Sequence, residues 1–252
     1  MPPISATIIT HNESANISRA IRSLDIADEI LVVDSGSTDD TVKIASALGA
    51  RTIAHSWEGF AAQKALAVSQ AAHDWILSLD ADEELNEEAR AAIRKWKESS
   101  PTVGAYRFAR RARYLGRWIL HSGWYPDWKI RLFHRNQAHW AGDYVHESVV
   151  ANGTVETLPG EILHYTCDSL DDHRKRIELY TDLAARELFE RGNSAGMASR
   201  WLAPVWVFVN TYFFRLGVLD GVPGLLIAWM AARYVRRKYV KLHQLQCRRE
   251  TP

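Results

Sequence analysis

The first hundred residues alternate between short apolar runs and stretches in which apolar side chains recur every three or four positions. Apolar runs rich in β-branched residues are typical of strands buried on both faces; they occupy 4–10, 29–34, 51–55 and 75–79. A spacing of three and four predicts helices, here over 17–24, 42–48 and 61–72. Strands separated by helices in this way predict a doubly wound, mostly parallel α/β sheet.

After the fourth run the pattern changes twice. Asn86, followed by Glu87 and Glu88, is expected to cap a helix that reaches about residue 97. From 101 to 166 only short β-like stretches stand out, at 105–109, 129–133 and 154–157. A polar helix is predicted from 170 to 191, where Gly192 ends it. We therefore divide the chain into a catalytic core (1–168), a helix and linker (169–199) and an apolar, then basic, region (200–252).

The last region is apolar from 201 to 230, but the apolar stretch is interrupted. The interruptions are Pro204, Asn210, Arg215, Asp220 and Pro223, and a membrane-spanning helix needs about 20 clean apolar residues. From Gly221 to Arg249 there is no Asp or Glu, whereas Lys and Arg recur. This pattern predicts a helical hairpin lying in a membrane interface, with the basic tail on anionic headgroups. The alternative is a helical pair that packs on the core or on a second subunit.

Composition narrows the class of protein only slightly. The chain has 252 residues, of which 47% are hydrophobic and 24% charged, as in ordinary folded domains. The net charge of +1 gives no indication of nucleic-acid binding, and no nucleic-acid partner is expected. The two cysteines lack metal-ligand spacing, and the N-terminus lacks a signal-peptide pattern, so a cytoplasmic location is expected.

Acidic residues follow the fourth apolar run directly. Asp80 and Asp82 are two positions apart, which on a strand places both carboxylates on one side. Two carboxylates with substrate phosphates and waters suit a hard ion such as Mg²⁺ or Mn²⁺, which would stabilise a diphosphate leaving group. Asp-x-Asp alone is weak evidence because acidic pairs also begin helices. Its place after a buried strand favours the metal site.

Two other predicted strands also end in polar residues. Asp34 is followed by a Ser/Gly/Thr/Asp turn, and the first strand ends in Thr10, His11, Asn12 and Glu13. Ligands bind beyond the carboxyl ends of strands in doubly wound sheets, so these side chains are candidates for binding a nucleotide. A turn-forming Asp and a simple helix start remain the alternatives.

These motifs together resemble a known family. Thr10-x-Asn12-Glu13, the run from Val32 to Thr41 and the run from Leu79 to Glu83 occur in the order and spacing of the family 2 glycosyltransferases of GT-A fold. The resemblance covers about residues 4–166. Further segments resemble the branch that adds glucose to inner-core heptose of lipopolysaccharide: 57–60, Gln63-Lys64, 129–133 and 145–147. That branch often has Asn where this chain has Ala65.

The resemblance implies roles at the matching positions. Thr10, Asn12, Glu13, Asp34 and Lys64 would bind the nucleotide-sugar donor. Asp80 would contact the ribose or the metal, Asp82 the metal, and His164 the metal or the diphosphate. For His164, which stands beside Tyr165, a packing role is the alternative. Lys129 and Arg131 would neutralise donor phosphates or an acidic acceptor, unless they form an exposed strand face.

An inverting transfer also needs a base that deprotonates the acceptor hydroxyl. Glu147 is the candidate because it matches the family's His-Glu pair. Asp127 and Asp143 are alternatives, and Glu147 would otherwise form a rim salt bridge with Arg131 or Arg135.

The resemblance implies a metal-dependent, inverting transfer from UDP-glucose to a lipid-linked lipopolysaccharide acceptor. With the C-terminal pattern, it predicts a protein that is peripheral on the inner face of the cytoplasmic membrane. A polyprenyl-phosphate sugar transferase is the nearest alternative. A sugar nucleotidyltransferase would begin with a Gly- and Arg/Lys-rich phosphate loop, which is missing here. A non-catalytic docking protein would not need Asp34, Asp80, Asp82 and Glu147 together. A dinucleotide oxidoreductase would need GxGxxG after the first strand, and the chain does not have it there.

Overall fold

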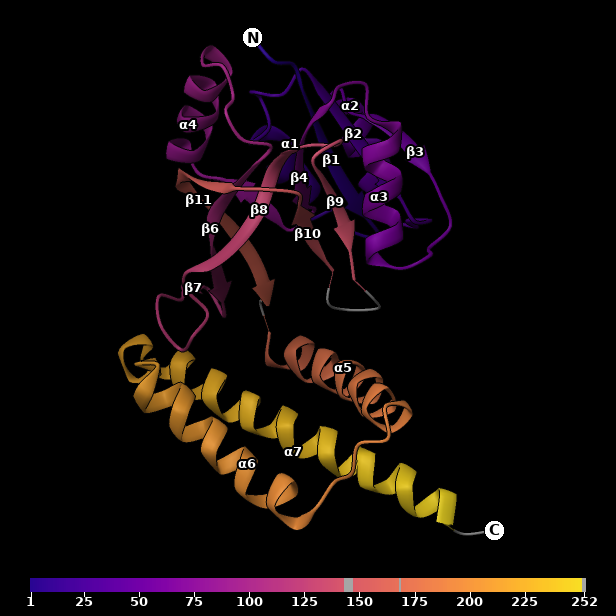
Figure 1. Ribbon diagram of the computed structural model, residues 1–252, viewed down its shortest axis with the longest axis vertical. Coiled ribbons are helices and arrows are strands. Elements are labelled where there is room, and N and C mark those ends of the chain that lie inside the picture. The colour runs from indigo at the N-terminus through magenta and orange to yellow at the C-terminus, as the bar shows by residue number, and fades with distance from the viewer. Residues whose placement is uncertain (143–146, 168, 251–252) are drawn as a thin grey trace. The chain divides into compact units, whose positions relative to one another are not determined.

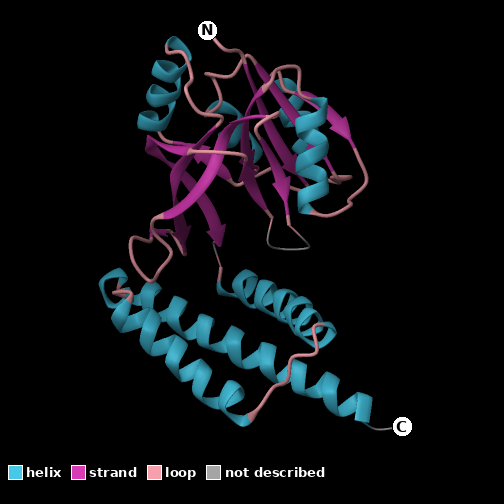
Figure 2. Cartoon of the chain, in the orientation of Figure 1, coloured by secondary structure: helices cyan, strands magenta, loops and turns pink. Residues whose placement is uncertain are grey.

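The computed structural model describes residues 1–142, 147–167 and 169–250. Two compact units are present (Figures 1 and 2). We call Met1–Arg111 with Asp127–Tyr165 the α/β unit, and Ala112–Pro126 with Thr166–Pro252 the helical unit. The excursion from Ala112 to Pro126 thus belongs with the C-terminal helices. The division of the chain at 168 and 199 stays a prediction.

A curled central sheet dominates the α/β unit (Figure 2). Its strand order is β3-β2-β1-β4-β8-β6-β11-β5. The strands are β1 (Ile4–Thr10), β2 (Glu29–Asp34), β3 (Arg51–Ala54), β4 (Trp75–Asp80), β5 (Glu83–Leu85), β6 (Ala105–Tyr114), β8 (Asp127–His134) and β11 (Val155–Cys167). β7 (Arg117–Trp118) pairs with β6, and β9 (Ala138–Ala141) with β10 (Ser148–Ala151) forms a second, two-stranded sheet.

The predicted parallel half of the sheet is confirmed. β1 pairs in parallel with β2 and β4, and β2 with β3. Beyond β4 the pairing reverses, since β8 is antiparallel to β4, and β6 to β8. The sheet therefore has a parallel half and an antiparallel half. The antiparallel strands β6 and β8 correspond to the short β-like stretches at 105–109 and 129–133.

The helices of the α/β unit follow the apolar periodicity. They are α1 (Ile17–Arg22), α2 (Thr41–Ala47), α3 (Phe60–Gln70) and α4 (Glu87–Glu98). Asn86 caps α4 as predicted, because its Oδ1 accepts a hydrogen bond from the backbone N–H of Ala89 at 2.8 Å. The buried core between sheet and helices includes Ile4, Ile17, Leu77 and Ile93. Each such side chain contributes about 1.5–3 kcal/mol by leaving water.

Sheet register brings the polar strand ends together. Thr10 on β1 pairs with Asp34 on β2, and Ile9 pairs with Asp80 on β4. The carboxyl ends of the three parallel strands therefore lie side by side at one edge, which is where doubly wound sheets bind ligands.

The helices of the helical unit are α5 (Leu170–Glu190), α6 (Met197–Val209), the π-helix η1 (Asn210–Phe214), the 3-10 helix η2 (Gly217–Asp220) and α7 (Val222–Glu250). α7 packs along both α5 and α6 (Figure 1). The outer faces of two helices are exposed and apolar: Trp201, Leu202, Val205 and Trp206 on α6, and Val222, Leu225 and Trp229 on α7. None of the helices in the described ranges is long and apolar enough to cross a membrane.

Candidate active site

The turns that follow β1 and β2 are joined by hydrogen bonds. The backbone N–H of Asn12 donates to Ser37 Oγ at 2.8 Å, and Asn12 Oδ1 accepts from the N–H of Thr38 at 2.8 Å. The N–H of Glu13 donates to Thr41 Oγ1 at 2.8 Å. Asn12 has φ of +56°, a conformation that Asn tolerates better than most residues. The two turns therefore form one polar floor beyond the strand ends.

Asp34 is buried within this floor. Its Oδ2 accepts hydrogen bonds from the N–H groups of Gly36 at 2.9 Å and Ser37 at 2.8 Å, so the carboxylate shapes its own turn. Fully buried Gln63 on α3 steadies the same loop by donating to Ser35 Oγ at 2.8 Å. The structure thus shows the turn-forming role of Asp34, and its contact with a nucleoside stays a prediction.

Thr10 ends β1 beside Asp34. Its hydroxyl is buried, and the described residues offer it no hydrogen-bond partner. Leaving a buried hydroxyl unpaired costs about 1–3 kcal/mol. An unpaired hydroxyl at this strand end is consistent with a binding site in which a ligand forms the hydrogen bond to Thr10.

Asp80 lies between two cations. Its Oδ1 is 2.7 Å from Lys64 Nζ, and its Oδ2 accepts a hydrogen bond from Arg131 at 2.9 Å. Burial opposes ionisation, but Arg131 and Lys64 outweigh it and lower the pKa of Asp80. Asp80 is therefore a firmly ionised carboxylate held in one orientation.

Lys64 connects Asp80 to the predicted base. Its ammonium group, on α3, is buried and also lies 3.0 Å from Glu147 Oε1. The same group stands 4.5 Å from the ring centroid of Trp140, a cation–π arrangement. Glu147 thus pairs with Lys64 rather than with Arg131 or Arg135, and it lies in the same cluster as Asp80.

Glu83 is a member of the cluster to which the sequence assigned no role. It is fully buried, and its Oε1 accepts hydrogen bonds from Arg131 at 2.7 Å and Arg110 at 2.9 Å. Burial alone would raise the pKa of this carboxyl. The positive charges of Arg131 and Arg110 outweigh that effect and bring the pKa down to about 2. Burial alone would lower the pKa of Arg131, but the negative charges of Glu83 and Asp80 outweigh it and raise that pKa. Arg131 is consequently held by protein carboxylates and is not an exposed strand residue.

Asp127, the alternative base, is paired as well. Arg110 donates to its Oδ2 at 2.6 Å, and Lys129 Nζ lies 3.1 Å from its Oδ1. Four carboxylates and four cations therefore alternate through the cluster: Asp80, Glu83, Asp127 and Glu147 with Lys64, Arg110, Lys129 and Arg131.

Asp82 differs from these carboxylates. Its only side-chain partner among the described residues is His164, whose Nε2 is 3.2 Å from Asp82 Oδ2. Two of the three predicted metal ligands, Asp82 and His164, are thus brought together, whereas the third, Asp80, is engaged with Lys64 and Arg131. Within the described ranges no three His, Cys, Asp or Glu side chains converge as a complete metal site. A carboxylate and an imidazole fit a divalent cation that takes its other ligands from substrate phosphates and water.

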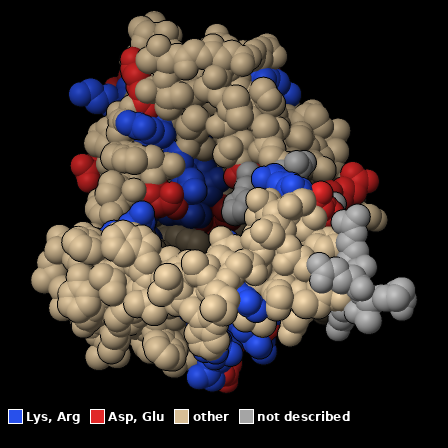
Figure 3. Space-filling model, turned by 60° about the horizontal axis from the view of Figure 1, so that its bottom comes forward, with Lys and Arg blue, Asp and Glu red and all other residues tan. Residues whose placement is uncertain are grey.

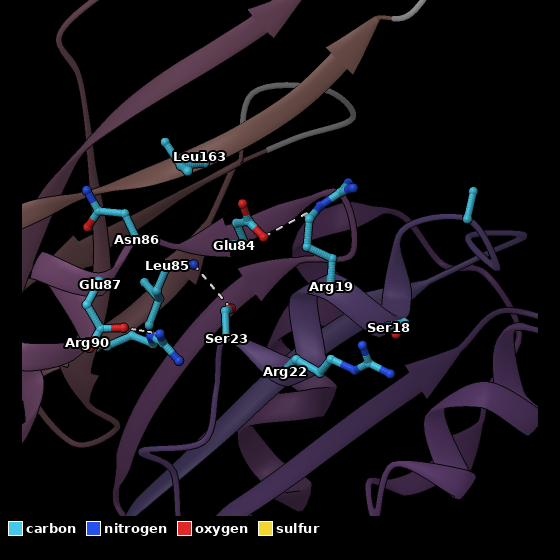
Figure 4. A pocket seen from close by; sticks show the side chains of 11 residues that line it. Ser18, Arg19, Arg22, Ser23, Glu84, Leu85, Asn86, Glu87, Arg90 and Leu163 are labelled. Atoms are coloured by element: carbon cyan, nitrogen blue, oxygen red, sulfur yellow. Dashed lines mark hydrogen bonds and ion pairs between the residues drawn. The ribbon is translucent and has the colours of Figure 1, made fainter.

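A separate pocket of about 620 Å³ lies on the α/β unit (Figure 4). It is lined by side chains of α1, β5 and the start of α4, including Arg19, Glu84 and Arg90. In Figure 4 Arg19 lies beside Glu84, and Arg90 beside Glu87. None of the predicted site residues lines this pocket.

Sequence patterns located most of the cluster but left parts of it out. Glu83 directly follows the Asp-x-Asp pair and could have been noticed there, whereas nothing local marks Arg110. Asp143 and His146 lie outside the described residues. Ala65, where the resembling branch often has Asn, is exposed.

Comparison with known proteins agrees with these motifs. The model of glycosyl transferase family 2 matches residues 5–152, more than half of the chain. An uncharacterized glycosyltransferase of Rickettsia prowazekii is 33% identical over 250 residues, covering 94% of this chain and 86% of the relative. The lipopolysaccharide core biosynthesis glycosyltransferase LpsC of Rhizobium meliloti is 29% identical, covering 99% of this chain and 95% of LpsC.

Among solved structures, the glucosyl-3-phosphoglycerate synthase of Mycobacterium tuberculosis, crystallised with Mn²⁺, UDP and its product, superposes with a TM-score of 0.36 at 24% identity over 44% of each chain. The family match and the full-length relatives are the decisive comparisons. The fold is of GT-A type, and the chain belongs to glycosyltransferase family 2.

Proposed function

We propose that this enzyme transfers glucose from UDP-glucose, with inversion, to an inner-core heptose of lipopolysaccharide at the cytoplasmic face of a membrane. LpsC is a lipopolysaccharide core biosynthesis glycosyltransferase, and the likeness extends over 99% of this chain. The observation that carries the proposal is the bridge formed by Lys64, which joins Asp80 at the end of β4 to Glu147.

The floor beyond β1 and β2 is the proposed nucleotide site. Thr10 offers a buried hydroxyl without a partner in the described chain, and Asp34 lies beside it. Asn12 and Glu13 hold the turn in place. With the donor on this floor, Asp80 at the neighbouring strand end would face its ribose or diphosphate.

Asp82 and His164 are the proposed protein ligands of Mg²⁺ or Mn²⁺. Asp82 suits this role because, unlike Asp80, Glu83, Asp127 and Glu147, it forms no ion pair with a Lys or Arg of the described chain. When bound, the cation would supply positive charge that stabilises the departing diphosphate.

Glu147 is the proposed base. It would take the proton of the acceptor hydroxyl while that oxygen bonds to the anomeric carbon and the bond from this carbon to the diphosphate breaks. Lys64 fixes the Glu147 carboxylate, at 3.0 Å, beside the donor site. A general base is worth about 10²–10⁴ in rate, so Glu147→Gln is expected to lower transfer by that factor with little change in donor binding. If Asp127→Asn has this effect and Glu147→Gln does not, Asp127 is the base.

The exposed apolar faces of α6 and α7 support the membrane location. Trp206 is 60% exposed and Trp229 62% exposed, and large exposed apolar patches mark interaction sites. Figure 3 shows a broad surface of the helical unit with few charged side chains. We propose that this surface lies in the interface of an anionic membrane, close to a lipid-linked acceptor.

The test is release of nucleoside diphosphate by the full chain. A panel of nucleotide sugars would be offered with and without Mg²⁺ or Mn²⁺, and with truncated lipopolysaccharide or polyprenyl phosphate as acceptor. The proposal predicts UDP release that requires the cation and is stimulated by lipopolysaccharide. Asp82→Ala should abolish it, whereas Asp74→Ala, on the loop before β4, should not. Stimulation by polyprenyl phosphate alone would identify the other acceptor class.

A further inference from the structure

A buried carboxylate ties two distant segments of the helical unit together. Asp220, at the end of η2, is 4% exposed. It accepts hydrogen bonds from the backbone N–H of His121 at 3.1 Å and from Ser122 Oγ at 2.9 Å, and it lies 3.1 Å from His121 Nδ1. In addition, the N–H of Ser122 donates to the carbonyl of Arg215 at 2.8 Å. We call residues 117–123 with 215–221 the tip of the helical unit.

Two arginines of the tip have no carboxylate partner among the described residues. Arg215 lies against Gly123, where an added Cβ would stand 2.3 Å from Arg215 Nη1 and would push the guanidinium group aside. Arg117 reaches Gly221 in a similar way, with Nη1 3.2 Å from the position of an added Cβ. Across the described chain, no Asp or Glu lies within ion-pair distance of either guanidinium. By contrast, Arg174 and Arg191 of the same unit are both paired with carboxylates.

The surroundings of these two charges are apolar. Phe213, Phe214, Leu216, Leu219 and Val222 are 50–68% exposed and flank Arg215 along the chain. Unpaired guanidinium groups amid exposed aromatic and aliphatic side chains match the boundary of a bilayer, where apolar side chains meet the acyl region and Arg reaches the headgroups. Arg also binds phosphate oxygens through two parallel N–H···O bonds.

We propose that Arg117 and Arg215 form a phosphate-binding site at the tip, which takes a phosphomonoester carried on a lipid. The inference rests on the proposed membrane association of α6 and α7. It adds a specific recognition of phosphate to that association, because Arg117 packs against Gly221, next to Asp220, and Arg215 packs against Gly123, next to the Ser122 that bonds Asp220. A phosphate that is free in solution shares this chemistry, and the experiment separates the two sources.

The full chain would be sedimented with phosphatidylcholine vesicles and with vesicles that also contain phosphatidic acid. Wild type is expected to prefer the second kind. A cation near an anionic membrane contributes about 1 kcal/mol, or about fivefold in the partition coefficient. Arg117→Gln and Arg215→Gln should each lower binding to phosphatidic acid vesicles by about this factor, while Arg174→Gln on α5 should not.

Inorganic phosphate, compared with chloride at equal ionic strength, identifies the source. If phosphate in solution displaces wild type but not the double variant Arg117→Gln, Arg215→Gln, the site takes free phosphate. If only phosphatidic acid produces the arginine-dependent gain, the ligand is borne by the membrane, as proposed. Arg215→Lys keeps the charge and the packed stem, so it should lose less binding than Arg215→Gln, and thermal unfolding would verify that each variant is folded.

One result would overturn the phosphate site, and a different result would overturn the membrane association. If the double variant retains the full preference for phosphatidic acid, the phosphate site is wrong and the membrane association stands. If wild type binds neither kind of vesicle, the membrane association itself is wrong.

Discussion

Single residues of the candidate site depend on one another through charge. Lys64 is 3% exposed and serves two carboxylates, at 2.7 and 3.0 Å. Removal of one partner from a buried ion pair costs about 3–5 kcal/mol, because the remaining charge is buried without compensation. Lys64→Met should therefore lower the free energy of unfolding by about 3 kcal/mol, the low end of that range, since Asp80 and Glu147 keep partial contact with water.

Urea denaturation at neutral pH would measure this loss. Lys64→Arg retains the positive charge and should lose much less stability. Equal stability of wild type and Lys64→Met would mean that Asp80 and Glu147 are not held together by this charge.

Glu83 makes stability depend on pH. Its pKa falls from 4.5 to about 2 in the folded chain, so its contribution is complete above pH 4.5 and is lost as pH falls toward 2. Each pKa unit corresponds to about 1.4 kcal/mol, which gives a loss of about 3 kcal/mol over this interval. Urea midpoints measured between neutral pH and pH 3 should fall more steeply for wild type than for Glu83→Gln. Parallel pH profiles for the two proteins would contradict the role of Glu83.

At the scale of elements, β11 approaches the first turn of α4 closely. Gly160 has φ of +90°, and a Cβ there would lie 2.1 Å from the backbone nitrogen of Ala89. Gly160→Ala should destabilise the protein by at least about 2 kcal/mol, because backbone strain and a clash with main-chain atoms add. Gly153→Ala is the matched control: its φ is +146°, but nothing lies within 4 Å of the added Cβ. Thermal unfolding would compare the two variants, and an equal loss would show that contact with α4 is unimportant.

Elements defined by local patterns were the ones the sequence predicted well. β1, β2 and β4 are apolar runs followed by polar residues, so the parallel half could be predicted from the order of residues alone. The same order placed Asp34 and Asp80 at strand ends, with Asp82 in the turn just after β4. Asn86 as the cap of α4 has the same local origin.

Elements that depend on distant pairing could not be predicted in this way. Arg110 meets Asp127 only because β6 and β8 are antiparallel with these residues in register. The loop from 112 to 126 joins the helical unit through Asp220, about a hundred residues later in the chain. Such contacts are set by packing and register, which leave no periodic trace in the sequence.

The same loop affects how the whole molecule can be tested. A chain cut after Ser199 would lose Asp220 and α7, and with them the partners of His121, Ser122 and Ile119. Weak vesicle binding by such a fragment would therefore have two causes that the experiment could not separate: loss of the membrane-binding surface and disruption of the segment from 112 to 126. Substitutions on the surface of the full chain avoid this difficulty.

The exposed apolar faces also predict how the whole molecule behaves without a membrane. Leu202, Trp206 and Leu219 are 59–68% exposed, and burial of apolar surface drives association at about 25 cal/mol per Å². Wild type should self-associate in plain buffer and become monomeric with detergent. The triple variant Leu202→Gln, Trp206→Gln, Leu219→Gln should stay monomeric in both, whereas Leu179→Gln, equally exposed but on α5, should behave as wild type.

Sedimentation velocity over a range of protein concentrations would separate the possibilities. Open-ended association that detergent reverses is expected of a surface whose natural partner is a bilayer, because micelles replace the lipid. A dimer of fixed size that persists in detergent would instead assign the α6 and α7 faces to a second copy of the chain. The membrane location would then have to rest on the tip arginines alone, and the vesicle experiment would decide whether they suffice.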